Sequence, residues 1–143
     1  MSLVLKVIER IKKKLYQLLP VGYFVKKIGQ KRGIVFLMYH STPIEANEFG
    51  YMTPKKQYEK QMEFLKEHFN IVSIDTAYEI LHQDRIFESK KPMAVITFDD
   101  GYRDNYEVAY PVLKHHNFPF TIFLTTDFIS NENKTFMSWD EVQ

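Results

Sequence analysis

The sequence contains no cysteine in its 143 residues. This absence excludes a disulfide framework and a metal site built on thiolates. The chain also has no internal repeat and no low-complexity segment. What it does have is 45% hydrophobic and 15% aromatic residues, a composition typical of one folded domain with a modest core.

Positive charge is scarce outside the first part of the chain, although the net charge of the whole is +1. Residues 1–32 hold nine Lys or Arg and one Glu, whereas residues 33–143 hold ten basic and seventeen acidic residues. The apolar residues of "MSLVLKVIERIKKKLYQLLP" recur at helical spacing up to Pro20. We therefore expect residues 1–32 to form a basic amphipathic helix and a linker, attached to an acidic domain at 33–143.

Charges interrupt residues 1–19 too often for a transmembrane span, and no signal-peptide cleavage pattern is visible. The segment could lie on an anionic membrane surface or pack on a protein. Its lysines belong to no recognisable nucleic-acid module, so no nucleic-acid partner is expected. These patterns favour a cytoplasmic protein or one peripheral at a membrane surface.

Apolar runs and helical spacing alternate along residues 33–143, which predicts an α/β fold with a parallel sheet. Thr53 is expected to cap the first helix, with Pro54 at its first position, and Asp75 to cap the second. Pro111 should kink the third helix. The expected strands are 34–40, 70–74, 93–98 and 118–126, and the first of them is expected to be covered on both faces. The first expected helix begins at Thr53, the second runs from Asp75 to His82, and the third covers 103–116. Tyr78, Ile80 and Leu81 are the expected apolar positions of the second helix.

A capping box at Ser138 and Glu141 predicts a further helix. The sequence ends two residues later, at Gln143. We therefore expect the chain to be the first part of a larger domain.

The stretch "AVITFDDGYRDNYEVAY" ends an apolar run in Asp99, Asp100 and Gly101. Asp-Gly favours a β-hairpin when strands flank it. The aromatic and apolar residues after Gly101 instead recur at helical spacing, which predicts a strand, a short loop and a helix. Ligands of α/β proteins bind at such carboxyl ends of strands.

Two adjacent carboxylates repel each other, and a divalent cation would stabilise both. A bound metal activates water, and the second carboxylate can take the proton as that water attacks a carbonyl. The pair therefore predicts hydrolysis of an ester or an amide. A catalytic zinc needs about three protein ligands. Of the five histidines, His40 also ends a buried strand, so it either joins this site or is a hydrogen-bonded structural residue.

"TFDDG" (97–101), with "LMYHSTP" (37–43) and "FLKEHFNIVSID" (64–75), resembles the polysaccharide deacetylase family, the NodB-homology domain of carbohydrate esterase family 4. The resemblance covers residues from about Ile34 onward. It implies the first part of a distorted (β/α) barrel and a metal-dependent hydrolase that removes N- or O-acetyl groups from a polysaccharide or oligosaccharide.

Carried over to this sequence, the resemblance implies that Asp99 is the catalytic base and Asp100 a metal ligand. His40 and Tyr102 are candidates for contact with the substrate or for support of the ligands. The metal is expected to be zinc, with cobalt, nickel or manganese also suited to a carboxylate–imidazole site. The family's H-[S/T]-x-x-H-P motif, which supplies the other ligands, does not occur in this sequence. We therefore expect this chain alone to be weakly active or inactive; the alternative is a non-catalytic glycan-binding or membrane-peripheral module.

Overall fold

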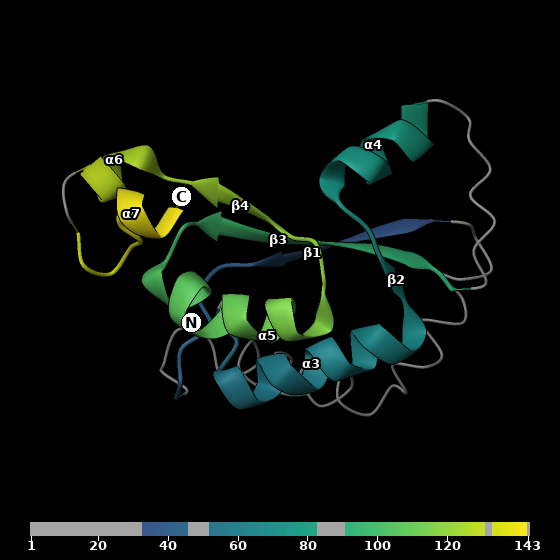
Figure 1. Cartoon of the computed structure of the whole chain (residues 1–143), viewed down its shortest axis with the longest axis horizontal. Coiled ribbons are helices and arrows are strands. Elements are labelled where there is room, and N and C mark those ends of the chain that lie inside the picture. The colour runs from purple at the N-terminus through teal and green to yellow at the C-terminus, as the bar shows by residue number, and fades with distance from the viewer. Residues whose placement is uncertain (1–32, 46–51, 83–90, 131–132, 143) are drawn as a thin grey trace, which may run out of the picture. The chain divides into compact units, whose positions relative to one another are not determined.

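The computed structural model of the chain describes residues 33–45, 52–82, 91–130 and 133–142. The expected basic amphipathic helix and linker of residues 1–32 lie outside these ranges. The described residues form a four-stranded parallel sheet with helices between the strands (Figure 1), which confirms the predicted α/β class. The strands are β1 (Ile34–Tyr39), β2 (Asn70–Ile71), β3 (Met93–Asp100) and β4 (Thr121–Leu124).

The helical elements keep the order that the hydrophobic periodicity predicts. They are α3 (Lys55–His68), α4 (Ile74–His82), a π-helix (Asn105–Ala109), α5 (Tyr110–His116), α6 (Thr126–Ser130) and α7 (Trp139–Val142). Among the described residues, no helix is long and apolar enough to cross a bilayer.

Strand β3 is the centre of the sheet. It pairs with β1 along one side from Met93 to Phe98, and on the other side with β2 at its start and β4 at its end. All its side chains from Met93 to Phe98 are buried. The continuous apolar run in the sequence reflects this position, because a strand flanked on both sides and covered needs no polar alternation.

Helices α3 and α5 lie along one face of the sheet (Figure 1). Tyr58 of α3 and Phe98 of β3 are fully buried there, with Tyr39 between them at ring-centroid distances of 5.3 and 5.5 Å. Burial raises the pKa of Tyr39 to about 12, so its phenol stays protonated and donates a hydrogen bond to Gln61 Oε1 at 3.0 Å. This aromatic cluster fixes the sheet directly beneath the end of β3.

The expectation that β1 is covered on both faces is wrong for the described part of the chain. Phe36 and Met38 are 50% and 64% exposed. Alternate side chains of a strand point to opposite faces, and along the second half of β1 exposed residues alternate with half-buried ones. Tyr78 and Leu81, expected as apolar positions of α4, are also exposed, and Ala77 is the buried residue of that helix.

Both predicted helix caps are wrong in detail. Ser73, not Asp75, caps α4, because its Oγ accepts the Thr76 N–H at 3.1 Å. Helix α3 begins at Lys55 with Pro54 as its N-cap residue and has no side-chain cap. Serine, like aspartate, is among the residue types that cap helices.

The helix predicted over 103–116 is not simply kinked at Pro111. Its hydrogen-bond pattern changes from π-helical to α-helical just before this proline. Residues 105–109 are π-helical, and the Tyr110 N–H donates to the Asn105 carbonyl five residues earlier. Pro111 then lies in the first turn of α5, where a missing N–H is tolerated. Single π-turns of this kind occur often at functional sites.

The predicted capping box of α7 is confirmed by the Ser138 N–H, which donates to Glu141 Oε2 at 2.7 Å. This bond is the largest cause that lowers the pKa of Glu141 below its ordinary value of 4.5. Because the pKa of Glu141 is lower in the folded state than its ordinary value of 4.5, ionised Glu141 stabilises the fold. This contribution is fully present above pH 4.5 and is lost as the pH falls through the pKa of Glu141 in the folded state.

We expect Glu141→Gln to lower the free energy of unfolding at pH 7 by about 0.5–1.5 kcal/mol. At pH 3 the difference from the wild type should shrink, because the wild-type carboxylate is then being protonated. Urea titrations at both pH values measure this, and a difference that stays constant with pH would contradict the role of the charge.

Candidate active site

The register of the sheet gathers polar residues at its carboxyl edge. Tyr39 of β1 lies opposite Phe98, so the next residues, His40 and Asp99, are neighbours. On the other side, Asp100 lies opposite Leu124, and Thr125 follows at once. Parallel strands end at the same edge, so three segments far apart in the sequence meet there.

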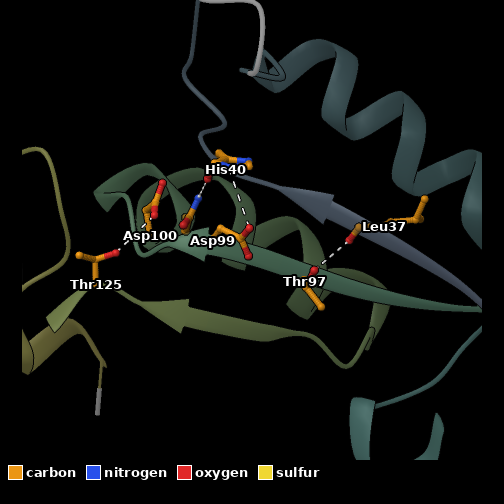
Figure 2. A network of polar contacts seen from close by, with 7 residues as sticks. Leu37, His40, Thr97, Asp99, Asp100 and Thr125 are labelled. Atoms are coloured by element: carbon orange, nitrogen blue, oxygen red, sulfur yellow. Dashed lines mark hydrogen bonds and ion pairs between the residues drawn. The ribbon is translucent and has the colours of Figure 1, made fainter. Parts of the chain in front are cut away.

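Asp99 lies next to His40. The distance from His40 Nε2 to Asp99 Oδ2 is 3.9 Å, and the two side chains are 28% and 31% exposed. Figure 2 shows the Asp99 carboxylate directed toward the imidazole across the gap between β1 and β3. Of the sequence-predicted site residues, these two are brought together, and both stay open to solvent.

Asp100 has a different neighbour. Thr125 Oγ1 donates to Asp100 Oδ1 at 3.3 Å, on the β4 side of the strand (Figure 2). The backbone of Asp100 has φ +70°, and that of Gly101 has φ +72°. Aspartate tolerates this left-handed conformation better than most residues. The adjacent carboxylates therefore have separate partners on separate strands.

Gly101 meets both a conformational and a steric demand. A Cβ atom added there would lie 2.7 Å from Leu124 Cδ2, in addition to the strain of its φ. We expect Gly101→Ala to lower the free energy of unfolding by about 1–2 kcal/mol from backbone strain alone, as measured by urea titration.

Asn117→Gly is the matched control, because Asn117 has φ +55° at the end of α5. Glycine is the preferred residue at such a position, so this variant should keep or slightly raise stability. Equal losses in both variants would contradict the account of Gly101.

Tyr102 packs against Phe136, with ring centroids 4.8 Å apart. The two residues also form an isolated β-bridge, which ties the loop after Gly101 to residues 135–137. These contacts give Tyr102 a structural role, and its expected contact with substrate stays a prediction.

The remaining histidines do not join the aspartates. In His68 and His82, Nδ1 lies within 3.0 Å of a backbone carbonyl four residues earlier in the same helix. His116 is buried near Glu63 of α3, with 3.5 Å between Nε2 and Oε1, and His115 lies beside it. Burial is the main cause that lowers the pKa of His116.

A metal site needs more ligands than the described residues bring together. No group of three His, Cys, Asp or Glu side chains in the described ranges could hold an ion. A catalytic zinc takes about three protein ligands. The described residues therefore do not fit a complete metal centre, and Asp100 could supply one ligand of such a centre.

A cavity of about 510 Å³ lies beside β4 and the helical residues after Gly101. Its walls include Ile122, Leu124, Tyr106 and Tyr110, but neither Asp99 nor Asp100. The acidic pair instead lies at the open end of the strands. The Asp99 carboxylate is partly exposed at the surface of the described structure, and it does not line this cavity.

Sequence reasoning missed a polar network beside the pair. Asn105 Nδ2 donates to the His40 carbonyl at 2.7 Å. Asp104 accepts hydrogen bonds from the Ser41 hydroxyl and, at 2.9 Å, from the Thr42 N–H. The signal was present, since polar residues directly follow strand β1 and directly precede the helical pattern. Their contact spans more than sixty residues, and local patterns do not reveal it.

Comparison with known proteins identifies the family. A family model described as polysaccharide deacetylase matches residues 88–143, which include the Asp99–Asp100 pair. YxkH of Bacillus subtilis, a protein named for this family, is 38% identical over 89 residues, 62% of this chain and 30% of its own length. The poly-β-1,6-N-acetyl-D-glucosamine N-deacetylase of Staphylococcus aureus is 29% identical over 126 residues, 87% of this chain and 41% of the relative.

Solved deacetylase structures share the fold. PplD of Streptococcus pyogenes, a deacetylase solved with acetate, superposes with a TM-score of 0.67 at 24% identity, over 76% of this chain and 50% of that one. IcaB from Ammonifex degensii superposes with a TM-score of 0.66 at 25% identity, over 77% and 46%. The chain thus spans well under half the length of the curated relatives it matches. Residues 88–143 thus match the polysaccharide deacetylase family, and the fold is that of solved deacetylases.

Proposed function

We propose that the protein to which these residues belong hydrolyses acetyl groups on a polysaccharide or oligosaccharide. The observation that carries the proposal is the acidic pair at the carboxyl end of β3, in which Asp99 lies beside His40 and Asp100 beside Thr125. The family match over residues 88–143 supports the reaction class.

Asp99 is the general base of this reaction. Its carboxylate is partly exposed and acts only as a hydrogen-bond acceptor when ionised, so it can take a proton from water. The oxygen of that water forms a bond to the acetyl carbon, and the bond from this carbon to the sugar nitrogen or oxygen breaks. Acetate leaves, and the freed amine or hydroxyl gains a proton. Positioned bases of this kind contribute about 10²–10⁴-fold to the rate.

Asp100 is one ligand of a divalent metal, most simply zinc. An ion held there would supply Lewis-acid chemistry, which is the polarisation of a carbonyl and a lower pKa of bound water. The described residues supply no group of three ligands, so Asp100 would need further ligands from outside these ranges. Within this chain, Thr125 Oγ1 donates to Asp100 and restricts the orientation of its carboxylate.

The substrate class is an acetylated amino-sugar polymer. The relative from Staphylococcus aureus is named for the N-deacetylation of poly-β-1,6-N-acetyl-D-glucosamine, and it aligns over 87% of this chain. An open strand edge, and not an enclosed cavity, suits a long polymer that passes over the surface.

The test is release of acetate from acetylated glucosamine oligomers by the protein expressed from its full coding sequence. The matched blank is the double variant Asp99→Ala, Asp100→Ala. We expect acetate from the wild type and none above background from the double variant. Equal release by both, or none by the metal-loaded wild type, would overturn the proposed function.

A further inference from the structure

We propose that Asp104 and Asn105 are positioning residues, which hold the end of β1 so that His40 lies beside Asp99. The proposal rests on the proposed deacetylase function for its kinetic consequence, but the contacts that it invokes are independent of that function. It adds two residues of the helix after Gly101 to the machinery of the site.

The need for such a restraint follows from the sheet. The ladder between β1 and β3 ends at the pair Tyr39 and Phe98. His40 follows this last pair, and its Nε2 lies 3.9 Å from Asp99 Oδ2. Contacts to the main chain of residues 40–42 therefore bear on where the imidazole lies.

Asn105 supplies the contact nearest to His40. Its side chain is 1% exposed, and its Nδ2 donates to the His40 carbonyl at 2.7 Å. The same nitrogen lies 3.2 Å from Asp104 Oδ1. Asn105 Oδ1 is buried and has no hydrogen-bond partner. A buried amide oxygen without a hydrogen-bond partner lowers stability. The hydrogen bond from Asn105 Nδ2 to the His40 carbonyl offsets this cost.

Asp104 fixes the next two residues. Its carboxylate accepts hydrogen bonds from the Ser41 hydroxyl and from the Thr42 N–H, and its carbonyl accepts the Thr42 hydroxyl at 3.2 Å. Ser41 and Thr42 are 3% and 0% exposed. Backbone bonds from Thr53 and Lys55 hold the far side of the same loop.

The same short helical segment contacts the end of β1 and follows directly after the acidic pair of β3. Asp104 and Asn105 follow Gly101 by only a few residues, so the turn that orients Asp99 and Asp100 also carries the anchors of His40. A small displacement of a catalytic group can cost about 10²-fold in rate. Because the His40 imidazole lies 3.9 Å from the proposed base Asp99, loss of the Asn105 amide should affect turnover through that pair, and not only through stability.

A double-mutant cycle tests this inference in the full protein. We expect Asn105→Ala to lower kcat/KM by about 10–100-fold in the wild type, but by no more than about twofold when His40 is already alanine. The matched control is Val108→Ala, a buried apolar truncation in the same π-helix, which should lower stability and leave kcat/KM near the wild-type value. An equal loss for Asn105→Ala in both backgrounds, or an equal loss in the control, would overturn the inference.

Hydrogen exchange gives a readout that does not depend on activity. The Thr42 amide should exchange slowly in the wild type and in Asp104→Asn, which keeps an acceptor, and quickly in Asp104→Ala. Unchanged protection in Asp104→Ala would overturn the role of Asp104 even in a fully active enzyme. The two claims can fail separately. If the wild type released no acetate, the proposed function would fail, but exchange of the Thr42 amide would still test whether Asp104 holds the loop.

Discussion

Asp99→Asn should slow acetyl hydrolysis by about 10²–10⁴-fold, which is the usual contribution of a general base. The amide is nearly the same size as the carboxylate but takes no proton from water. The substitution also removes the charge of the group that lies 3.9 Å from His40 Nε2. Steady-state acetate release by the full protein, compared as kcat, measures the effect.

Chemical rescue provides the control for Asp99. In Asp99→Ala, added formate can enter the space of the lost side chain and accept the proton, so kcat should rise with formate concentration. Asp99→Asn fills that space and should respond little. Two results would speak against Asp99 as the base. One is that formate raises kcat in neither Asp99→Ala nor Asp100→Ala, and the other is that it raises kcat in Asp100→Ala but not in Asp99→Ala.

Phe98→Ala should give the largest loss of stability among substitutions near the site, about 3–5 kcal/mol. Phe98 is fully buried and contacts the rings of Tyr39, Tyr58 and Phe120. Its removal leaves a cavity in the aromatic cluster directly beneath Asp99. Urea titration of the free energy of unfolding measures the loss.

Phe98→Leu is the matched control, because leucine leaves a smaller cavity and keeps the position apolar. We expect it to cost clearly less than alanine. If the two variants lost the same stability, the cost would come from loss of the aromatic ring contacts and not from the cavity.

Features with local signals were predicted well from the sequence. The run from Met93 to Phe98 is continuous and apolar because β3 is buried at the centre of the sheet. The helical spacing after Gly101 correctly excluded a hairpin, although the sequence did not show the π-helical register ahead of Pro111. The Ser138–Glu141 cap depends on residues three apart and was equally visible.

Features that depend on the assembled sheet were not predicted. The exposure of Phe36 and Met38 depends on which face of β1 the helices cover, and an apolar run does not contain that information. The bond from Asn105 to the His40 carbonyl joins residues 65 apart in the sequence. His40 itself was found because it ends a strand, whereas the residues that hold it were not.

The central claim is that the two neighbouring carboxylates have different tasks. The most direct measurement compares bound metal and acetate release in Asp99→Asn and Asp100→Asn, prepared side by side from the full coding sequence. The account predicts that the first variant keeps its metal and loses turnover, while the second loses metal affinity. Equal metal loss in both variants, or full turnover in the first, would contradict it.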